Sequence, residues 1–172
     1  MDLRFIAPHL RKLDLAGTEV LVACTAEQER PPHGVAGLVD WRLAGRISRL
    51  MEEGIVTGEL GEVVLVPGKP KLPFDKVLLF GVGPERELDE RVFRHVVEKM
   101  LATLEGLCAR SAVVQLPGRA ADLIEPERAA DVLLECAGGR PEHDVWTLVE
   151  PPEAQRSVTQ HMVQERRRVR EL

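Results

Sequence analysis

Residues 76–108 read KVLLFGVGPERELDERVFRHVVEKMLATLEGLC, and this stretch decides the fold class. Its opening run, 76–80, is aliphatic in the way that is typical of a buried β-strand. From 89 to 108 apolar residues recur every three or four positions, which predicts an amphipathic helix with an acidic start that suits the helix dipole. Gly81-Val82-Gly83-Pro84 separates the two segments. A strand, a glycine turn and a helix in this order indicate an α/β protein.

The same alternation continues on both sides of this stretch. Short aliphatic or β-branched runs predict further strands at 3–7, 19–24, 62–66, 112–116 and 144–149. Helical spacing predicts one helix over 41–53, capped by Asp40, and another over 126–137, while the polar, proline-broken run 25–34 predicts a surface loop. Several strands are apolar throughout, as in sheets buried on both faces. We therefore expect residues 1–150 to form a three-layer α/β/α domain with a mixed, largely buried sheet.

The last segment, 151–172, differs in character. After Pro151-Pro152 it is polar, with a narrow apolar stripe and a basic cluster. The cluster consists of Arg166, Arg167, Arg168 and Arg170, flanked by Glu165 and Glu171. Three structures remain open for this segment: a helix packed on the domain, a helix offered to a partner, or a frayed tail.

Composition excludes several classes of function. The chain has 172 residues, enough for one domain with a real core, and a formal net charge of -5, which gives no general attraction to nucleic acid or to an anionic membrane. No apolar run is long enough to span a bilayer, so we expect no membrane partner and a cytoplasmic location. The arginine cluster leaves a DNA-associated role as a weaker alternative. Cys24, Cys108 and Cys136 are expected to be reduced core residues.

Three segments together resemble the N-terminal domain of the M17 leucyl aminopeptidases. They are WRLAGRISRL at 41–50, TGELGE at 57–62 and KVLLFGVG at 76–83, and their order and spacing are similar to those of the family. The likeness extends more weakly over 19–150. It implies a fold similar to macro domains.

The resemblance also implies an absence. Peptidase activity in that family belongs to a C-terminal domain with a two-metal site and an N-T-D-A-E-G-R motif. That motif does not occur here, and the chain ends about where that domain would begin. We therefore expect no peptidase activity, no catalytic set, no metal and no cofactor.

Two glycine-containing loops are candidate ligand sites. Gly81, Val82, Gly83 and Arg86 lie between a strand and a helix, where backbone N–H groups can hold a phosphate. However, Arg86 stands where a dinucleotide-binding fingerprint has its third glycine, and neighbouring carboxylates oppose a phosphate. Gly138 and Gly139 form the second candidate, but they also fit the end of a helix. For both loops a tight structural turn is the alternative interpretation.

The leading hypothesis is a non-catalytic domain that associates with itself or with a protein partner, such as a peptidase-type catalytic chain. The alternative is an ADP-ribose or nucleotide-binding module that uses the two glycine loops. A binding module should have a deep pocket at the carboxyl edge of the sheet, with backbone N–H groups facing in. An association module should have a shallow edge there and an apolar patch elsewhere.

Overall fold

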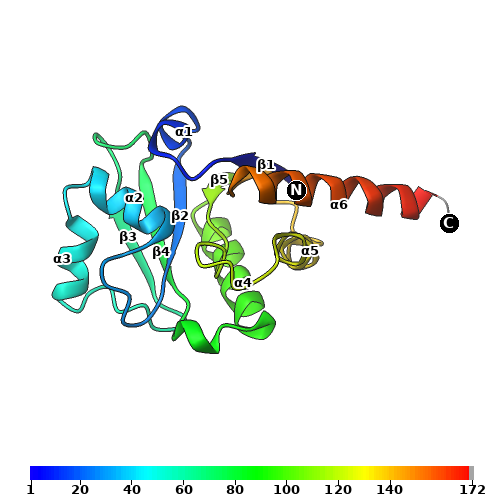
Figure 1. The fold of residues 1–172 in the computed structure, drawn as a ribbon. Coiled ribbons are helices and arrows are strands. Elements are labelled where there is room, and N and C mark those ends of the chain that lie inside the picture. Colours follow the sequence, from blue (N-terminus) through cyan, green and yellow to red (C-terminus); the bar gives the residue numbers. More distant parts are fainter. Residues whose placement is uncertain (171–172) are drawn as a thin grey trace.

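The computed structural model describes residues 1–170 and has a three-layer α/β/α architecture (Figure 1). In chain order the elements are β1 (Asp2–Ile6), α1 (Leu10–Leu15), β2 (Val20–Thr25), α2 (Gly34–Arg42), α3 (Arg46–Glu52), β3 (Val63–Pro67), β4 (Lys76–Gly81), the short 3-10 helix η1 (Glu85–Glu87), α4 (Glu90–Gly106), β5 (Ser111–Val114), α5 (Pro126–Ala137), β6 (Val145–Val149) and α6 (Pro152–Arg170). The predicted fold class is confirmed.

The sheet has six strands in the order β1-β6-β5-β2-β4-β3. Every neighbouring pair is parallel except β3 with β4, which is antiparallel. The carboxyl ends of five strands therefore lie along one edge of the sheet. Ligands of open parallel sheets bind outside such an edge, which makes this edge the first place to search for a site.

Helices cover both faces of the sheet, and strand alternation supplies a core on each side. On β2, Val20 and Val22 pack with α4 and α5, while Leu21 and Ala23 pack with α1, α2 and α3. Figure 1 shows α2 and α3 on one side of β2 and β4, and α4 on the other. A strand buried on both faces explains why its sequence is continuously apolar.

The helix predicted over 41–53 is two helices, and the first begins earlier than expected. Helix α2 starts at Gly34, at the end of the predicted surface loop, and α3 starts after a break at Ala44-Gly45, where both residues have positive φ (56° and 79°). Asp40 does act as a cap, but for α3: its carboxylate accepts hydrogen bonds from Ser48 N (2.9 Å) and Ser48 Oγ (2.6 Å). Helix α1 has no counterpart in the sequence-based prediction.

Helix α6 resolves the open question about residues 152–170. Its first half packs on α5: Ala154 and Val158 are buried, Ser157 donates a hydrogen bond to Glu127, and His161 Nε2 lies 2.9 Å from Asp131 Oδ2. Its second half projects beyond the domain (Figure 1). Glu171, which belongs to the predicted basic end, lies with Leu172 outside the described residues, as does the side chain of Arg170.

One expectation about the cysteines is wrong. All three are free, and Cys136 is buried and Cys24 half-buried, but Cys108 is exposed. Cys108 follows the end of α4 with a φ of 55°, and this left-handed turn leaves its side chain in solvent rather than on the apolar face of the helix.

The cap formed by Asp40 gives a first testable prediction. Asp40→Ala should lower the free energy of unfolding by about 1 kcal/mol, because it leaves the first turn of α3 without its acceptor. Urea denaturation followed by circular dichroism measures the effect. Glu52→Ala, at an exposed position near the end of the same helix, is the matched control and should change little. Equal stabilities of the two variants would contradict the assigned cap.

Candidate functional site at the carboxyl edge of the sheet

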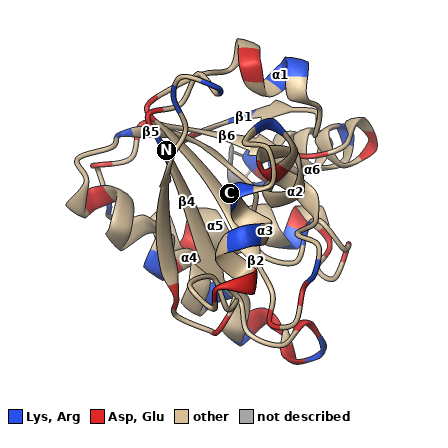
Figure 2. Cartoon of the chain, turned by 90° about the vertical axis from the view of Figure 1, so that its left-hand side faces the viewer, with Lys and Arg blue, Asp and Glu red and all other residues tan. Residues whose placement is uncertain are grey.

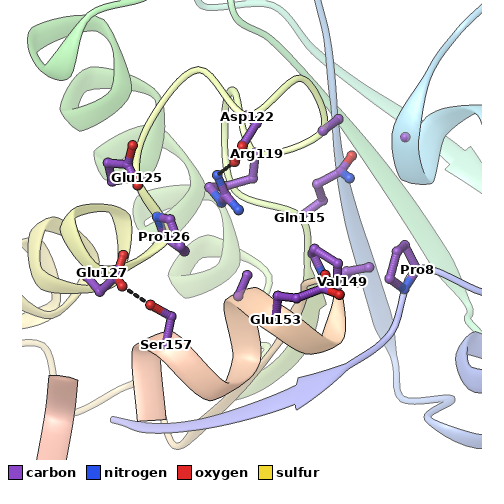
Figure 3. A pocket seen from close by; sticks show the side chains of 14 residues that line it. Pro8, Gln115, Arg119, Asp122, Glu125, Pro126, Glu127, Val149, Glu153 and Ser157 are labelled. Carbon is purple, nitrogen blue, oxygen red and sulfur yellow. Dashed lines mark hydrogen bonds and ion pairs between the residues drawn. The ribbon is translucent and has the colours of Figure 1, made fainter. Parts of the chain in front are cut away.

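Two cavities lie at the carboxyl edge and share Gln115 and Ala120 in their walls. The larger, about 640 Å³, lies between Pro8, the loop 119–125 and the starts of α5 and α6, and we call it the Arg119 cavity (Figure 3). The smaller, about 300 Å³, lies beyond the ends of β2, β4 and β5, and we call it the Thr25 cavity. The sheet edge is thus hollow rather than shallow.

Arg119 is the one arginine or lysine in the described walls of the two cavities, and its hydrogen-bonding capacity is used within the chain. Its Nε and Nη2 bind the two oxygens of Glu150 at 2.8 and 2.9 Å, and both side chains are almost fully buried. Its Nη1 binds Asp122 Oδ1 at 2.6 Å and the carbonyl of Ile124 at 2.5 Å. Burial alone would lower the pKa of Arg119, but these hydrogen bonds outweigh it and raise the pKa. These contacts use four of the five N–H donors of the guanidinium, which leaves one Nη2–H for a ligand.

Three backbone N–H groups at this edge are also occupied. Glu29 accepts hydrogen bonds from Ala26 N (2.7 Å) and His33 N (2.5 Å), and Gln115 Oε1 accepts one from Val35 N (3.0 Å). These amides belong to the loop after β2 and to the start of α2, where an anionic ligand would bind. The carboxylate of Glu29 and the side-chain amide oxygen of Gln115 accept the hydrogen bonds that such an anion would accept.

The cavity walls carry an excess of negative charge. Asp122, Glu125, Glu127 and Glu153 surround the Arg119 cavity, and Glu29 and Glu85 line the Thr25 cavity. Burial, reinforced by the charge of Glu29, raises the pKa of Cys24 far above that of an ordinary thiol. Cys24 is therefore a neutral wall residue, because only the thiolate is a strong nucleophile.

Of the four candidate residues in the first glycine loop, the structure places one in the wall of a cavity at this edge. Val82 lines the Thr25 cavity, whereas Gly81 and Gly83 pack against the loop that precedes β3. Gly83 N donates to Gly58 O at 2.8 Å, and a Cβ on Gly81 would collide with the carbonyl of Glu59. Arg86 is exposed in η1, 4.0 Å from Glu87. Close backbone packing accounts for both glycines.

Gly138 and Gly139 lie at the opposite edge of the sheet, because they precede β6 while Gly81 ends β4. They border a shallow hollow together with Met1 and Arg140. The two candidate loops therefore do not form one site.

Sequence reasoning missed the residues that shape the cavities. Thr25 ends β2, while Gln115 and Glu150 each follow the end of a strand, so the rule that sites gather at carboxyl ends could have found them. Arg119 and Glu29 lie in loops without a periodic pattern. Asp122 and His33 are near them in sequence, but the buried partner Glu150 is 31 residues from Arg119 and the other partners are backbone groups, which the sequence does not indicate.

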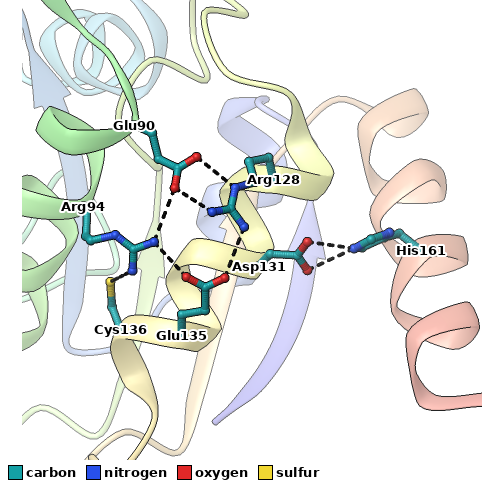
Figure 4. A network of polar contacts seen from close by, with 7 residues as sticks. All are labelled: Glu90, Arg94, Arg128, Asp131, Glu135, Cys136 and His161. Carbon is teal, nitrogen blue, oxygen red and sulfur yellow. Dashed lines mark hydrogen bonds and ion pairs between the residues drawn. The ribbon is translucent and has the colours of Figure 1, made fainter. Parts of the chain in front are cut away.

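A second polar cluster ties the outer helices together (Figure 4). Arg128 binds Glu90 and Glu135, and Arg94 binds the same two carboxylates, which joins α4 to α5. Hydrogen bonds from Arg128 and Arg94 lower the pKa values of Glu90 and Glu135, respectively. All four side chains are paired and partly exposed, so the cluster is structural. Within residues 1–170, no three His, Cys, Asp or Glu side chains are grouped to hold a metal ion.

The strand order and the covering helices place the chain in the macro-domain class of α/β folds. The macro domain of ganglioside induced differentiation associated protein 2 aligns with a TM-score of 0.70 at 12% identity, covering 92% of this chain and 81% of that one. A Trypanosoma brucei macrodomain in complex with ADP-ribose gives 0.70 at 18% identity, covering 94% and 68%. A tomato leucine aminopeptidase mutant gives 0.63 at 13% identity, covering 94% of this chain but 35% of that one. At these identities the likeness shows the fold.

Sequence comparison identifies the family. The model of the cytosol aminopeptidase family, N-terminal domain, matches residues 21–135, and the chain belongs to this family. The cytosol aminopeptidase of Pseudomonas aeruginosa is 34% identical over 100 residues, 58% of this chain and 20% of that protein. A probable cytosol aminopeptidase of Pseudomonas fluorescens is 37% identical over 99 residues, again 58% and 20%. The chain thus spans about a fifth of the length of these relatives, and the predicted resemblance is confirmed.

The matched region is the N-terminal domain of the family, which is not its catalytic domain. In the described part of the chain, no helix combines the length and the apolar composition that crossing a membrane requires.

The buried ion pair beside the Arg119 cavity gives a second prediction. Arg119→Met should lower the free energy of unfolding by about 3–5 kcal/mol, because it leaves Glu150 buried without its cation. Urea denaturation at neutral pH measures the change.

Arg119→Met combined with Glu150→Met should recover most of that loss, since two apolar side chains leave no unpaired buried charge. Arg86→Met, at an exposed arginine, serves as the control. If Arg119→Met were as stable as the unchanged protein, the buried ion pair between Arg119 and Glu150 would not contribute to stability as we predict.

Proposed function

We propose that this domain is a non-catalytic association module, which binds a second copy of itself or a peptidase-type protein chain. The observation that carries the proposal is the exposure of one large apolar side chain on each of α1 and α2. Leu15 is 84% exposed and Trp41 is 74% exposed, the highest values among the large apolar side chains of the described residues. Large exposed apolar groups of this kind mark interaction surfaces when they occur together.

An ion pair fixes the two helices relative to each other. Arg42 at the end of α2 forms a bidentate contact with Asp14 near the end of α1, with N–O distances of 2.8 and 3.0 Å. Leu15 and Trp41 are the chain neighbours of these two residues. We call the surface that carries them the α1–α2 face. A rigid surface binds at a lower entropic cost than a flexible one, which supports its use as a contact.

Tryptophan suits the role of an anchor. A Trp side chain buries on the order of 150–250 Å² and is among the residues that dominate binding energy at interfaces. A stable interface covers about 800 Å² per partner, so Trp41 and Leu15 would supply the centre and neighbouring polar residues the rim. Figure 2 shows basic and acidic positions interspersed on the side that carries α2 and α3, as expected for a polar rim.

Family membership supports a non-enzymatic role. The matched segment corresponds to the N-terminal domain of proteins about five times the length of the aligned region, and the catalytic domain is a different part of the family. A cytoplasmic location is consistent with relatives that are cytosol aminopeptidases. The DNA-associated alternative rests on Arg166, Arg167 and Arg168 at the projecting end of α6 and has weaker support, since the chain as a whole is acidic.

The α1–α2 face gives a third prediction. If the domain associates with itself, Leu15→Ser with Trp41→Ser should reduce the mass measured by light scattering over a concentration series, because it removes the apolar anchor. Leu65→Ser on the edge strand β3 is the matched control, since Leu65 is a 49% exposed leucine on a different element. A mass that falls with the control and not with the double variant would assign association to the strand edge instead.

Tryptophan fluorescence tests whether the α1–α2 face itself is covered when a complex forms. Trp41 and Trp146 are the two tryptophans, and Trp146 is fully buried. In a Trp146→Phe background Trp41 is the only reporter, and its emission should shift to shorter wavelength when a second copy or a peptidase-type chain covers it. Complex formation without that shift would place the contact elsewhere on the domain.

ADP-ribose or nucleotide binding is the alternative function. It is supported by the two cavities at the carboxyl edge and by a fold shared with a macrodomain solved with ADP-ribose. It is opposed by the chemistry of the walls, where Glu29 and Gln115 already bind three backbone amides and Arg119 has one N–H donor left. The phosphates of such a ligand would also lie near wall carboxylates that no lysine or arginine of the described residues neutralises.

A thermal-shift experiment tests this alternative and gives the fourth prediction. ADP-ribose at millimolar concentration should leave the melting temperature within about 1 °C of the ligand-free value, because a ligand without affinity for the folded state does not stabilise it. A macro domain that binds ADP-ribose is the positive control for the assay. A rise of several degrees in the melting temperature of this chain would contradict the expected lack of binding and favour the binding-module function.

A further inference from the structure

The Thr25 cavity contains a polar side chain that the fold does not use. Thr25 lies at the end of the central strand β2, is 1% exposed, and lines the cavity. Its hydroxyl Oγ1 has no hydrogen-bond partner in the structure of residues 1–170. A buried hydroxyl without a partner costs free energy, so a group that fills the cavity and bonds to Thr25 would remove that cost.

A nearly buried carboxylate lines the same cavity. The side chain of Glu29 is 12% exposed, and its ion-pair contact in the described structure is to the histidine His33 rather than to a lysine or arginine. The adjacent Arg30 is directed to the carbonyl of Met51. The carboxylate binds two backbone amides, which leaves further lone pairs on its oxygens. A buried charge of this kind is stabilised by an opposite charge.

The remaining wall is largely apolar. Leu88, Leu116 and Leu123 line the cavity, and Glu85 stands at its border as a second carboxylate. No lysine or arginine lies in the wall as described. The cavity therefore combines an apolar body, one unpartnered hydroxyl and net negative charge.

We propose that the Thr25 cavity binds a small primary ammonium group carried on a compact apolar body. The ammonium donates hydrogen bonds to Thr25 Oγ1 and the Glu29 carboxylate, while the apolar body packs against Leu88, Leu116 and Leu123. Such a ligand uses each feature that the fold leaves unsatisfied. An anion finds no lysine or arginine in the described wall, and a neutral molecule leaves Glu29 with His33 as its one possible counter-charge there.

Three probes with the same hydrocarbon body test the charge that the cavity selects. Phenethylamine, phenethyl alcohol and hydrocinnamate are titrated into the full chain by isothermal calorimetry, with amide chemical shifts recorded in parallel. We expect the amine to bind at least tenfold more tightly than the alcohol, because hydrogen bonds between charged groups contribute more than neutral ones, and we expect no binding of the carboxylate. The amides of Ala26 and His33 should shift, since both bind Glu29.

Two variants test the assigned residues. Thr25→Val keeps the shape and removes a hydroxyl that has no partner, so it should fold normally and bind the amine about tenfold more weakly. Glu29→Gln should weaken the amine further. It also disturbs two backbone hydrogen bonds, and for that reason Thr25→Val is the decisive variant. Thr159→Val, on the exposed side of α6, is the matched control.

Each contrary outcome overturns the proposal. Equal affinity for amine and alcohol would show that charge does not select the ligand, and tighter binding of hydrocinnamate would reverse the sign of the site. If the amine bound the Thr25→Val variant with unchanged affinity, its binding site would be another acidic surface. The absence of binding by any probe at millimolar concentration would show that the cavity is not a site for this class of ligand.

Discussion

Burial of β2 on both faces is the constraint on which the rest of the structure depends. Val20 to Ala23 are fully buried, and successive side chains enter the two cores in turn. A strand of this kind needs a partner strand on each side and helices above and below. It pairs in parallel with β4 and β5, which brings the ends of all three strands to one edge. The Thr25 cavity is therefore a consequence of the same pairing that builds the core.

The fold uses its own side chains to hold the loops at the carboxyl edge of the sheet. Glu29 holds the loop after β2, Gln115 holds the start of α2, and Arg119 is enclosed by Glu150 and Asp122. Each contact satisfies a group that would otherwise be buried without a partner. Together they stabilise the edge and occupy three backbone amides and most donors of Arg119, groups that could otherwise bind a phosphate. A fold shared with a macrodomain solved with ADP-ribose therefore does not by itself assign that chemistry to this chain.

The sequence predicts the fold well because periodicity reports burial directly. The predicted bounds of α5 agree with the structure, and those of β4 and α4 agree to within a residue or two. Prediction fails where long-range or backbone geometry decides. The break at Ala44-Gly45 depends on positive φ, and the cap of α3 comes from Asp40 five residues before the helix N-cap. Gly81 and Gly83 were ambiguous in sequence because a phosphate loop and a close backbone contact both require glycine.

Helix α2 connects the two proposed surfaces, and its contacts determine how they should relate. Val35 at its start is bound to Gln115 in the cavity wall, and Arg42 at its end is bound to Asp14 beside the α1–α2 face. Nine residues of helix span about 13 Å, more than the distance over which substitutions usually interact. Coupling over such a distance needs an element with two arrangements, whereas α2 is fixed at both ends. We therefore expect changes in the cavity and on the α1–α2 face to act independently, so that ligand binding and association are separate properties of one domain.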